Sequence, residues 1–364
     1  MSIEEQPSSQ NKTTSQSSWL KKIILTLFIL GIIAAGIAAW ILYPVYLERK
    51  ENINETFRGK LIEIPDTIGT LQALSSFLFE KGIIAEQESF LALAQKNNLP
   101  VAIGTYRLDK TAKSNRDLQR ALRADKRIAQ LVFHNIRTKE QLAGVLSQRV
   151  EADSLAFINL FNDSIYLQSL GFQPHTIIAA FIPNTYEVYW NTAPEAIIER
   201  MIKEYHKFWN EQRLEKAKAL EMTPIQISTL ASIVETESQY APERPRIAGV
   251  YLNRLKKNWL LQADPTVVFA VGDFTITRVL NKHLATESPY NTYKNEGLPP
   301  GPIYMPSTNA IDAVLNYETH EYMFFCAKPD FSGQHAFAKT LSAHNTNAKV
   351  YHQWLNSIKK NKAN

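Results

Sequence analysis

The uncharged apolar run Ile23–Tyr43 constrains this chain more than any other feature. Its length matches the roughly 20 residues that an α-helix needs to cross a bilayer. Trp19 and Trp40 stand where interfacial aromatic residues belong, and Pro44 is expected to end the segment. A cleaved signal peptide is the alternative, because the run contains the small-residue stretch "AAGIAA". The apolar run continues past this stretch, beyond a typical signal core, which favours an uncleaved transmembrane helix over 23–43.

The flanking charges predict the orientation only weakly. Residues 1–22 form a polar tail, predicted to be disordered over the first 20 residues, with Lys21 and Lys22 beside the membrane. Arg49 and Lys50 follow the apolar run, so the difference in positive charge is small. The tail is expected in the cytoplasm and the rest outside it, after a charged linker at 45–55.

Composition limits the classes of protein that remain. A chain of 364 residues has room for about two domains. The formal net charge of +5 is too even for a dedicated nucleic-acid binder, although it suits a membrane surface or an anionic polymer. The single cysteine, Cys326, can form no internal disulfide or cysteine metal cluster and is expected to be buried.

The exported part reads as an α+β protein with a small module before a larger domain. In 57–145, strand-like and helix-like stretches alternate without any catalytic constellation, which favours a binding or spacer module. Helical patterns then dominate, including a long polar-rich stretch over 193–220. Thr223 followed by Pro224 predicts the start of another helix, because a hydroxyl cap and an early proline favour helix initiation.

Several chemistries have no motif in the sequence. It contains no phosphate-binding P-loop, dinucleotide-binding glycine turn, nucleophile elbow or H-E-x-x-H zinc motif. His335 and His344 do not have a recognised zinc spacing and are expected to be surface or hydrogen-bonded histidines. We therefore expect no metal and no cofactor.

Two carboxylates stand out in "LASIVETESQY". On a helix beginning at Pro224, Glu237 lies about 60° from the centre of the apolar stripe and Glu235 about 100°. Glu237 is therefore favoured as the desolvated acid, with the raised pKa that a general acid needs at neutral pH. The structural alternative is an acid that is solvated or paired with Arg244 or Arg246.

Ordered motifs from about residue 229 to 346 resemble the YceG-like family of membrane-anchored endolytic murein transglycosylases. The motifs are "LASIVETES", "ERPRIAGVYLNRL", "LLQADPTVV", "SPYNTYKNEGLPPGPI" and "GQHAFAKTLSAHN". By this resemblance, Glu237 is the catalytic acid. The resemblance also implies substrate-binding and supporting residues: Gln262, Asp264, Thr266, Tyr290, Asn291 and Tyr293 in the cleft, with Glu235, Asn253 and Arg254 in support.

The resemblance also implies an organisation and an activity. It suggests a LysM-like module at 57–145 and a catalytic YceG-like domain at 146–358 with a lysozyme-like catalytic helix. The implied substrate is peptidoglycan, cut at MurNAc–GlcNAc β-1,4 bonds inside nascent strands to give 1,6-anhydroMurNAc ends. This activity would terminate strand elongation at the cytoplasmic (inner) membrane, beside peptidoglycan synthases. Asn184 and Ala263 depart from the family pattern. A non-catalytic, membrane-anchored wall-binding protein is the rival interpretation.

Overall fold

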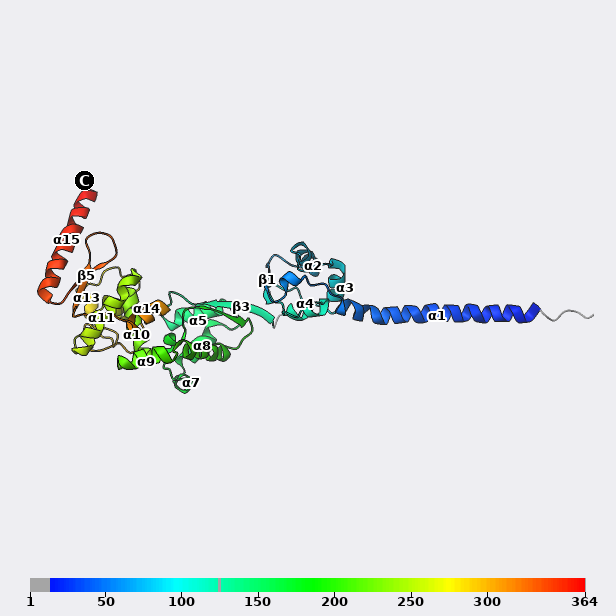
Figure 1. The fold of residues 1–364 in the computed structure, drawn as a ribbon, viewed down its shortest axis with the longest axis horizontal. Helices are drawn as coiled ribbons and strands as arrows, with labels where there is room; N and C mark the ends of the chain where they lie inside the picture. Colours follow the sequence, from blue (N-terminus) through cyan, green and yellow to red (C-terminus); the bar gives the residue numbers. More distant parts are fainter. Residues whose placement is uncertain (1–13, 124–125, 364) are drawn as a thin grey trace, which may run out of the picture. The chain divides into compact units, whose positions relative to one another are not determined.

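The computed structural model describes residues 14–123 and 126–363, which divide into two compact units (Figure 1). The first unit ends at Ile128 and the second begins at Ala129. This division lies before the expected boundary at 145/146. The reason is that Leu131, Leu142 and Leu146 are buried in the core of the second unit.

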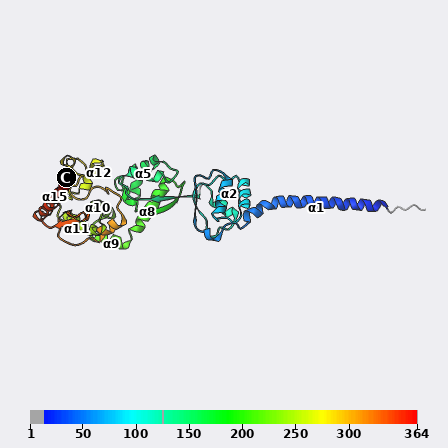
Figure 2. The same cartoon turned by 90° about the horizontal axis from the view of Figure 1, so that it is seen from above.

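The first helix, α1 (Thr14–Arg49), is longer than the sequence predicts (Figure 2). Its part from Trp19 to Arg49 is long and apolar enough to cross a membrane, with a mean hydropathy of 2.6. The prediction that Pro44 ends the helix is wrong, and residues 45–49 are helical rather than linker. A proline inside a helix removes one backbone hydrogen bond. Packing compensates for this loss, because Leu47 is buried and α1 contacts two helices of the first unit. Residues 1–13 of the predicted disordered tail lie outside the described residues.

The predicted βα module is present in the first unit. Its elements are η1 (Glu55–Phe57), β1 (Leu61–Ile64), α2 (Leu71–Glu80), α3 (Gln87–Lys96), β2 (Gly104–Arg107) and α4 (Asn115–Ala121). Strands β1 and β2 are antiparallel, with Ile62 opposite Tyr106. Both side chains are buried on the core side of the pair. Ser114 and Asp117 form a capping box at the start of α4.

Buried amides tie the end of α1 to this module. Asn115 Nδ2 donates to the carbonyl of Leu47 at 3.1 Å. Asn52 Nδ2 donates to Asn115 Oδ1 at 2.7 Å, and both amides contact Ser89. Because buried amides are costly to leave unpaired, this network fixes the last turn of α1 against α3 and α4.

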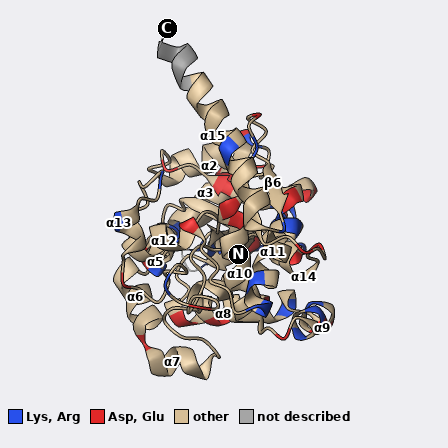
Figure 3. Cartoon of the chain, turned by 90° about the vertical axis from the view of Figure 1, so that its left-hand side faces the viewer, with Lys and Arg blue, Asp and Glu red and all other residues tan. Residues whose placement is uncertain are grey.

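The second unit begins within β3 (Arg127–Val132) and is mainly helical. Its first elements are α5 (Lys139–Ser147), α6 (Ser154–Asn162), α7 (Ser164–Ser169), η3 (Ile177–Ala180), β4 (Thr185–Tyr189), α8 (Pro194–Phe208) and α9 (Glu211–Ala219). The polar stretch predicted over 193–220 is divided into α8 and α9. Asn210 starts the second helix by accepting a hydrogen bond from the backbone of Arg213. Both basic and acidic residues occur on the elements of this unit (Figure 3).

The remaining elements begin with α10 (Pro224–Glu237) and continue to the end of the described chain. The others are η4 (Ala241–Glu243), α11 (Arg244–Lys256), α12 (Asp264–Val271), α13 (Asn281–Leu284), α14 (Thr308–Leu315), β5 (Phe324–Ala327), β6 (His335–Ala338) and α15 (Leu341–Ala363). Thr223 caps α10 and Pro224 begins it, as predicted. Helices α11, α12 and α14 pack against α10, which fixes the position of its C-terminal end. Cys326 on β5 is free and half-buried rather than buried.

Candidate active site

Helix α10 is buried on all sides along its middle and opens only at its C-terminal end. Every residue from 227 to 234 is buried, so the single apolar stripe predicted from the sequence is too narrow. The buried hydroxyls of Thr229 and Ser232 donate to carbonyls one turn earlier, at 2.8 and 2.7 Å. The last turn, with Glu235 and Glu237, is half-buried.

Glu237 lines a cavity of about 610 Å³. Asp264 and Phe269 of α12 line it as well, together with Ile303 and residues from three other segments. Burial raises the pKa of Glu237 to about 7, and the negative charge of Asp264 acts in the same direction. The hydrogen bond from Tyr251 and the charge of Arg254 oppose this rise. A carboxyl group with this pKa is partly protonated at neutral pH and can donate a proton to a ligand in the cavity.

Tyr251 is a site residue that the sequence analysis did not identify. Its hydroxyl donates to Glu237 Oε1 at 2.7 Å, and its buried ring packs edge-on against Phe325 at 5.9 Å. Burial raises the pKa of Tyr251 well above its usual value, so the phenol stays protonated and keeps donating. The helical spacing in "YLNRL" offered a signal, because Tyr251 and Arg254 are three residues apart on one face of α11.

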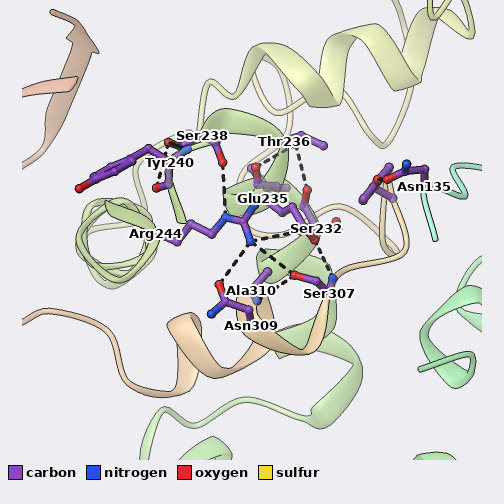
Figure 4. A network of polar contacts seen from close by, with 12 residues as sticks. Asn135, Ser232, Glu235, Thr236, Ser238, Tyr240, Arg244, Ser307, Asn309 and Ala310 are labelled. Carbon is purple, nitrogen blue, oxygen red and sulfur yellow. Dashed lines mark hydrogen bonds and ion pairs between the residues drawn. The ribbon is translucent and has the colours of Figure 1, made fainter. Parts of the chain in front are cut away.

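Glu235 has a different environment, shown in Figure 4. Its carboxylate forms an ion pair with Arg244 at 3.2 Å and accepts from the backbone N–H of Ser307 at 2.6 Å. Arg244 also donates to the carbonyl of Ser238 and to Asn309 Oδ1, each at 3.4 Å. The ion pair with Arg244 that the sequence left open is thus formed by Glu235, while Arg246 pairs with Glu318. Glu235 joins α10 to the starts of α11 and α14.

Three of the six residues expected in the cleft are at or near the cavity. Asp264 lines it and accepts a hydrogen bond from Tyr293 Oη at 2.6 Å. Tyr290 packs against the cavity residue Phe269, with ring centroids 4.6 Å apart. Gln262 is exposed and has a positive φ of 49° just before α12.

Thr266 and Asn291 are buried instead of facing the cavity. Thr266 Oγ1 contacts Thr292 Oγ1 at 2.8 Å, while Asn291 Nδ2 donates to two loop carbonyls at 2.8 and 3.0 Å. These bonds occupy both side chains. The geometry therefore gives them a role in bracing the loops around α12 rather than in touching a ligand.

The expected supporting residues of α11 hold neighbouring backbone. Asn253 Nδ2 donates to the carbonyls of His320 and Tyr322 at 2.8 and 3.0 Å. Arg254 donates to the carbonyls of Met323, at 2.9 Å, and Leu261. Elsewhere, His335 is hydrogen-bonded to Glu243 at 2.7 Å, as the sequence predicts. Within the described residues, no cluster of three His, Cys, Asp or Glu could hold a metal ion.

Comparisons with known proteins identify relatives of this chain. The model of the YceG-like family matches residues 62–350. The endolytic murein transglycosylase of Bacillus subtilis is 29% identical over 328 residues, covering 85% of this chain and 88% of that protein. The enzyme of the same name from Streptococcus pneumoniae is 33% identical over 149 residues, covering 40% of this chain and 27% of that protein.

A solved structure is similar as well. The crystal structure of a YceG-like protein from Listeria monocytogenes has a TM-score of 0.53 and 28% sequence identity. It covers 79% of this chain and 98% of the solved one. With a family match over most of its length, this chain belongs to the YceG-like family.

Proposed function

We propose that this protein is an endolytic murein transglycosylase, a lyase that cuts peptidoglycan glycan strands at internal MurNAc–GlcNAc β-1,4 bonds. The observation that carries the proposal is the environment of Glu237. Its carboxyl lines the cavity, has a pKa of about 7 and accepts a hydrogen bond from a buried phenol. The relatives that bear the name of this activity support the choice of substrate.

The proposed reaction uses one carboxyl group twice. Protonated Glu237 donates its proton to the glycosidic oxygen as the bond from that oxygen to C1 of MurNAc breaks. The C6 hydroxyl oxygen of the same sugar then bonds to C1, and its proton passes to the Glu237 carboxylate. The products are a 1,6-anhydroMurNAc end and a free GlcNAc hydroxyl, with no water consumed and the acid restored.

A second candidate reaction is hydrolysis, and the position of Asp264 is the observation that favours it. A hydrolase needs a second carboxylate to activate water or to stabilise the sugar cation. Asp264 lines the same cavity as Glu237, whereas Glu235 is bound to Arg244 and Ser307. Asp264 accepts from Tyr293, an arrangement that also suits holding a sugar hydroxyl. Hydrolysis by Glu237 and Asp264 would leave a reducing MurNAc end instead of an anhydro end.

The substrate contacts are proposals too. We assign Asp264, Tyr290, Tyr293 and Gln262 to the sugar-binding surface beside Glu237. Asp264 lines the cavity, Tyr290 and Tyr293 contact residues that line it, and Gln262 is exposed two residues before Asp264. Thr266 and Asn291 support this surface through their buried hydrogen bonds. Glu235, Asn253 and Arg254 hold the surrounding helices and loops.

We also propose a membrane-bound arrangement. Helix α1 would anchor the protein in the cytoplasmic membrane by a single pass, with residues 1–22 inside and the chain that follows the membrane helix outside. The 57–145 region would act as a LysM-like glycan-binding module and 146–358 as the catalytic domain, acting beside peptidoglycan synthases to terminate strands. A non-catalytic wall-binding protein is disfavoured by the acid with a raised pKa in the cavity.

The test is a digestion of purified sacculi by the full-length protein in detergent, followed by mass spectrometry of the muropeptides. Anhydro-muropeptides from the interior of strands are expected. Reducing ends alone would establish hydrolysis and overturn the transglycosylase proposal. An absence of new ends would overturn the enzyme proposal and favour the wall-binding alternative.

A further inference from the structure

The cavity beside Glu237 contains two arginines for which the sugar chemistry has no use. Arg137 comes from the segment between β3 and α5, and Arg278 from the loop between α12 and α13. That loop also supplies Phe274. We call Arg137, Phe274 and Arg278 the basic wall.

The structure holds Arg137 in place. Its guanidinium carbon is 4.9 Å from the centre of the Phe274 ring, and its side chain is half-buried. Stacking on an aromatic ring reduces the freedom of an arginine while leaving its N–H donors available. Among the ion pairs of the described residues, carboxylates pair with Arg58, Arg200, Arg213, Arg244 and Arg246, and with neither arginine of the wall.

The cavity is lined by the acids Glu237 and Asp264 and by the two arginines of the basic wall, and the arginines can bind a negatively charged group of a ligand. A guanidinium binds a carboxylate through two parallel hydrogen bonds, and a neutral sugar offers no such partner. In a peptidoglycan strand, the carboxylates belong to the peptide stem. The stem is attached through the lactyl group on C3 of MurNAc, the sugar whose C1 bond is broken in the proposed reaction. A stem is therefore within one sugar ring of the acid whenever the bond is in position.

We propose that the basic wall binds a carboxylate of the peptide stem, so that the enzyme selects stem-bearing strands over bare glycan. This inference rests on the proposed function and goes beyond it by naming the chemical feature that is recognised. Phe274 fixes Arg137 for this contact, and Arg278 adds a second, exposed donor. The pyrophosphate of a lipid-linked strand carries charge as well, and strands without lipid exclude it from the test.

The experiment compares three substrates for the full-length protein in detergent. They are lipid-free strands with intact stems, the same strands with stem carboxylates amidated by ammonia and a carbodiimide, and strands stripped of stems by an amidase whose exposed lactyl carboxylates are then amidated in the same way. We expect kcat/KM to be about tenfold higher for intact stems than for the other two. Arg137→Gln and Arg278→Gln should each reduce this ratio, and the double variant should bring it close to one. Arg149→Gln changes an exposed arginine after α5 and should keep the wild-type ratio.

Each result has a definite meaning. Equal kcat/KM on all three substrates, or an unchanged ratio in the double variant, overturns the proposal. The proposal is also overturned if kcat/KM falls for stripped strands but stays at the intact-stem value for amidated strands. In that case the enzyme recognises the stem but not its charge. Binding of the same strands to Glu237→Gln, measured by calorimetry, separates this inference from the proposed function. Stem-dependent binding without any cleavage by the wild type would contradict the proposed enzyme activity but support stem binding by the basic wall.

Discussion

The hydroxyl of Tyr251 lies 2.7 Å from Oε1 of Glu237, and this pair joins α11 to the end of α10 inside the cavity. The phenol occupies one oxygen of the carboxyl group and leaves the other for a ligand. It also favours the ionised form of Glu237, and so limits the rise in pKa that burial causes. Tyr251 is thereby a positioning residue that sets both the orientation and the acidity of the proposed acid.

Removing this hydroxyl should move the pH dependence of the reaction. In Tyr251→Phe the carboxylate loses a donor, so the pKa of Glu237 should rise by about one unit. A general acid must be protonated, so kcat/KM falls as pH increases through that pKa, and the alkaline limb should shift to higher pH. The pH profile of kcat/KM measures this shift. Tyr240→Phe, which changes an exposed tyrosine, should leave the profile in place.

Mutations of the two glutamates of α10 should have different effects, on activity for Glu237 and on stability for Glu235. Glu237→Gln should lower kcat/KM by about 100-fold or more, since it removes the proton donor. Glu235→Gln should keep most activity in the folded protein but lower the free energy of unfolding by about 3 kcal/mol, because Arg244 is left buried without its partner. Kinetics and thermal unfolding of each variant measure these effects.

A double-mutant cycle controls for the ion pair. Arg244→Met and Glu235→Met should each be about as destabilising as Glu235→Gln, and the variant that combines Arg244→Met with Glu235→Met should lose less stability than the sum of the two. Additive losses would show that the pair is not coupled. Activity abolished by Glu235→Gln in a folded protein would contradict the structural role of Glu235.

The raised pKa of Glu237 should cost stability at alkaline pH. The folded pKa of about 7 exceeds the usual 4.5, so the folded state binds the proton more tightly than the unfolded chain between these values. Stability is therefore lost as pH rises through this window. Between about pH 5 and pH 8, the free energy of unfolding of the wild type should fall by about 2 kcal/mol relative to that of Glu237→Gln. Calorimetric unfolding measures this fall, and a constant difference would show that Glu237 is not shielded.

The amide network of the first unit should control the last turn of α1. Asn115→Ala removes the donor to the Leu47 carbonyl and the Oδ1 that accepts from Asn52 at 2.7 Å. We expect a loss of about 2 kcal/mol, seen as faster hydrogen exchange in α3, in α4 and at residues 47–49. Gln95→Ala changes an exposed residue of α3 and is the matched control. Equal hydrogen exchange in the two variants would contradict the proposal that the amide network fixes the last turn of α1.

The local elements could be predicted because their signals are local. Caps such as Thr223 and Ser114 use bonds within one turn, and the strand pair β1–β2 follows from alternation. The end of α1 could not be predicted from Pro44, because burial of Leu47 against another part of the chain outweighs the lost backbone bond. The early boundary of the second unit likewise depends on long-range packing of Leu142 and Leu146.

Sequence motifs indicated part of the candidate site. Contacts between residues distant in the sequence could not be predicted from them. The sequence favoured Glu237 on a one-sided helix, yet α10 is buried all round and both acids are half-buried. Their difference lies in their partners, a phenol for Glu237 and a guanidinium for Glu235. Arg137 could not be found from sequence, because it meets Phe274 from a distant segment.

The most direct test of the central claim is digestion of glycan strands in water enriched in heavy oxygen, with mass spectrometry of the new MurNAc ends. If Glu237 serves as both acid and base for an intramolecular attack, the new ends are anhydro sugars without heavy oxygen, and Glu237→Gln forms none. Reducing ends that carry heavy oxygen, or anhydro ends formed equally by Glu237→Gln, would contradict the account.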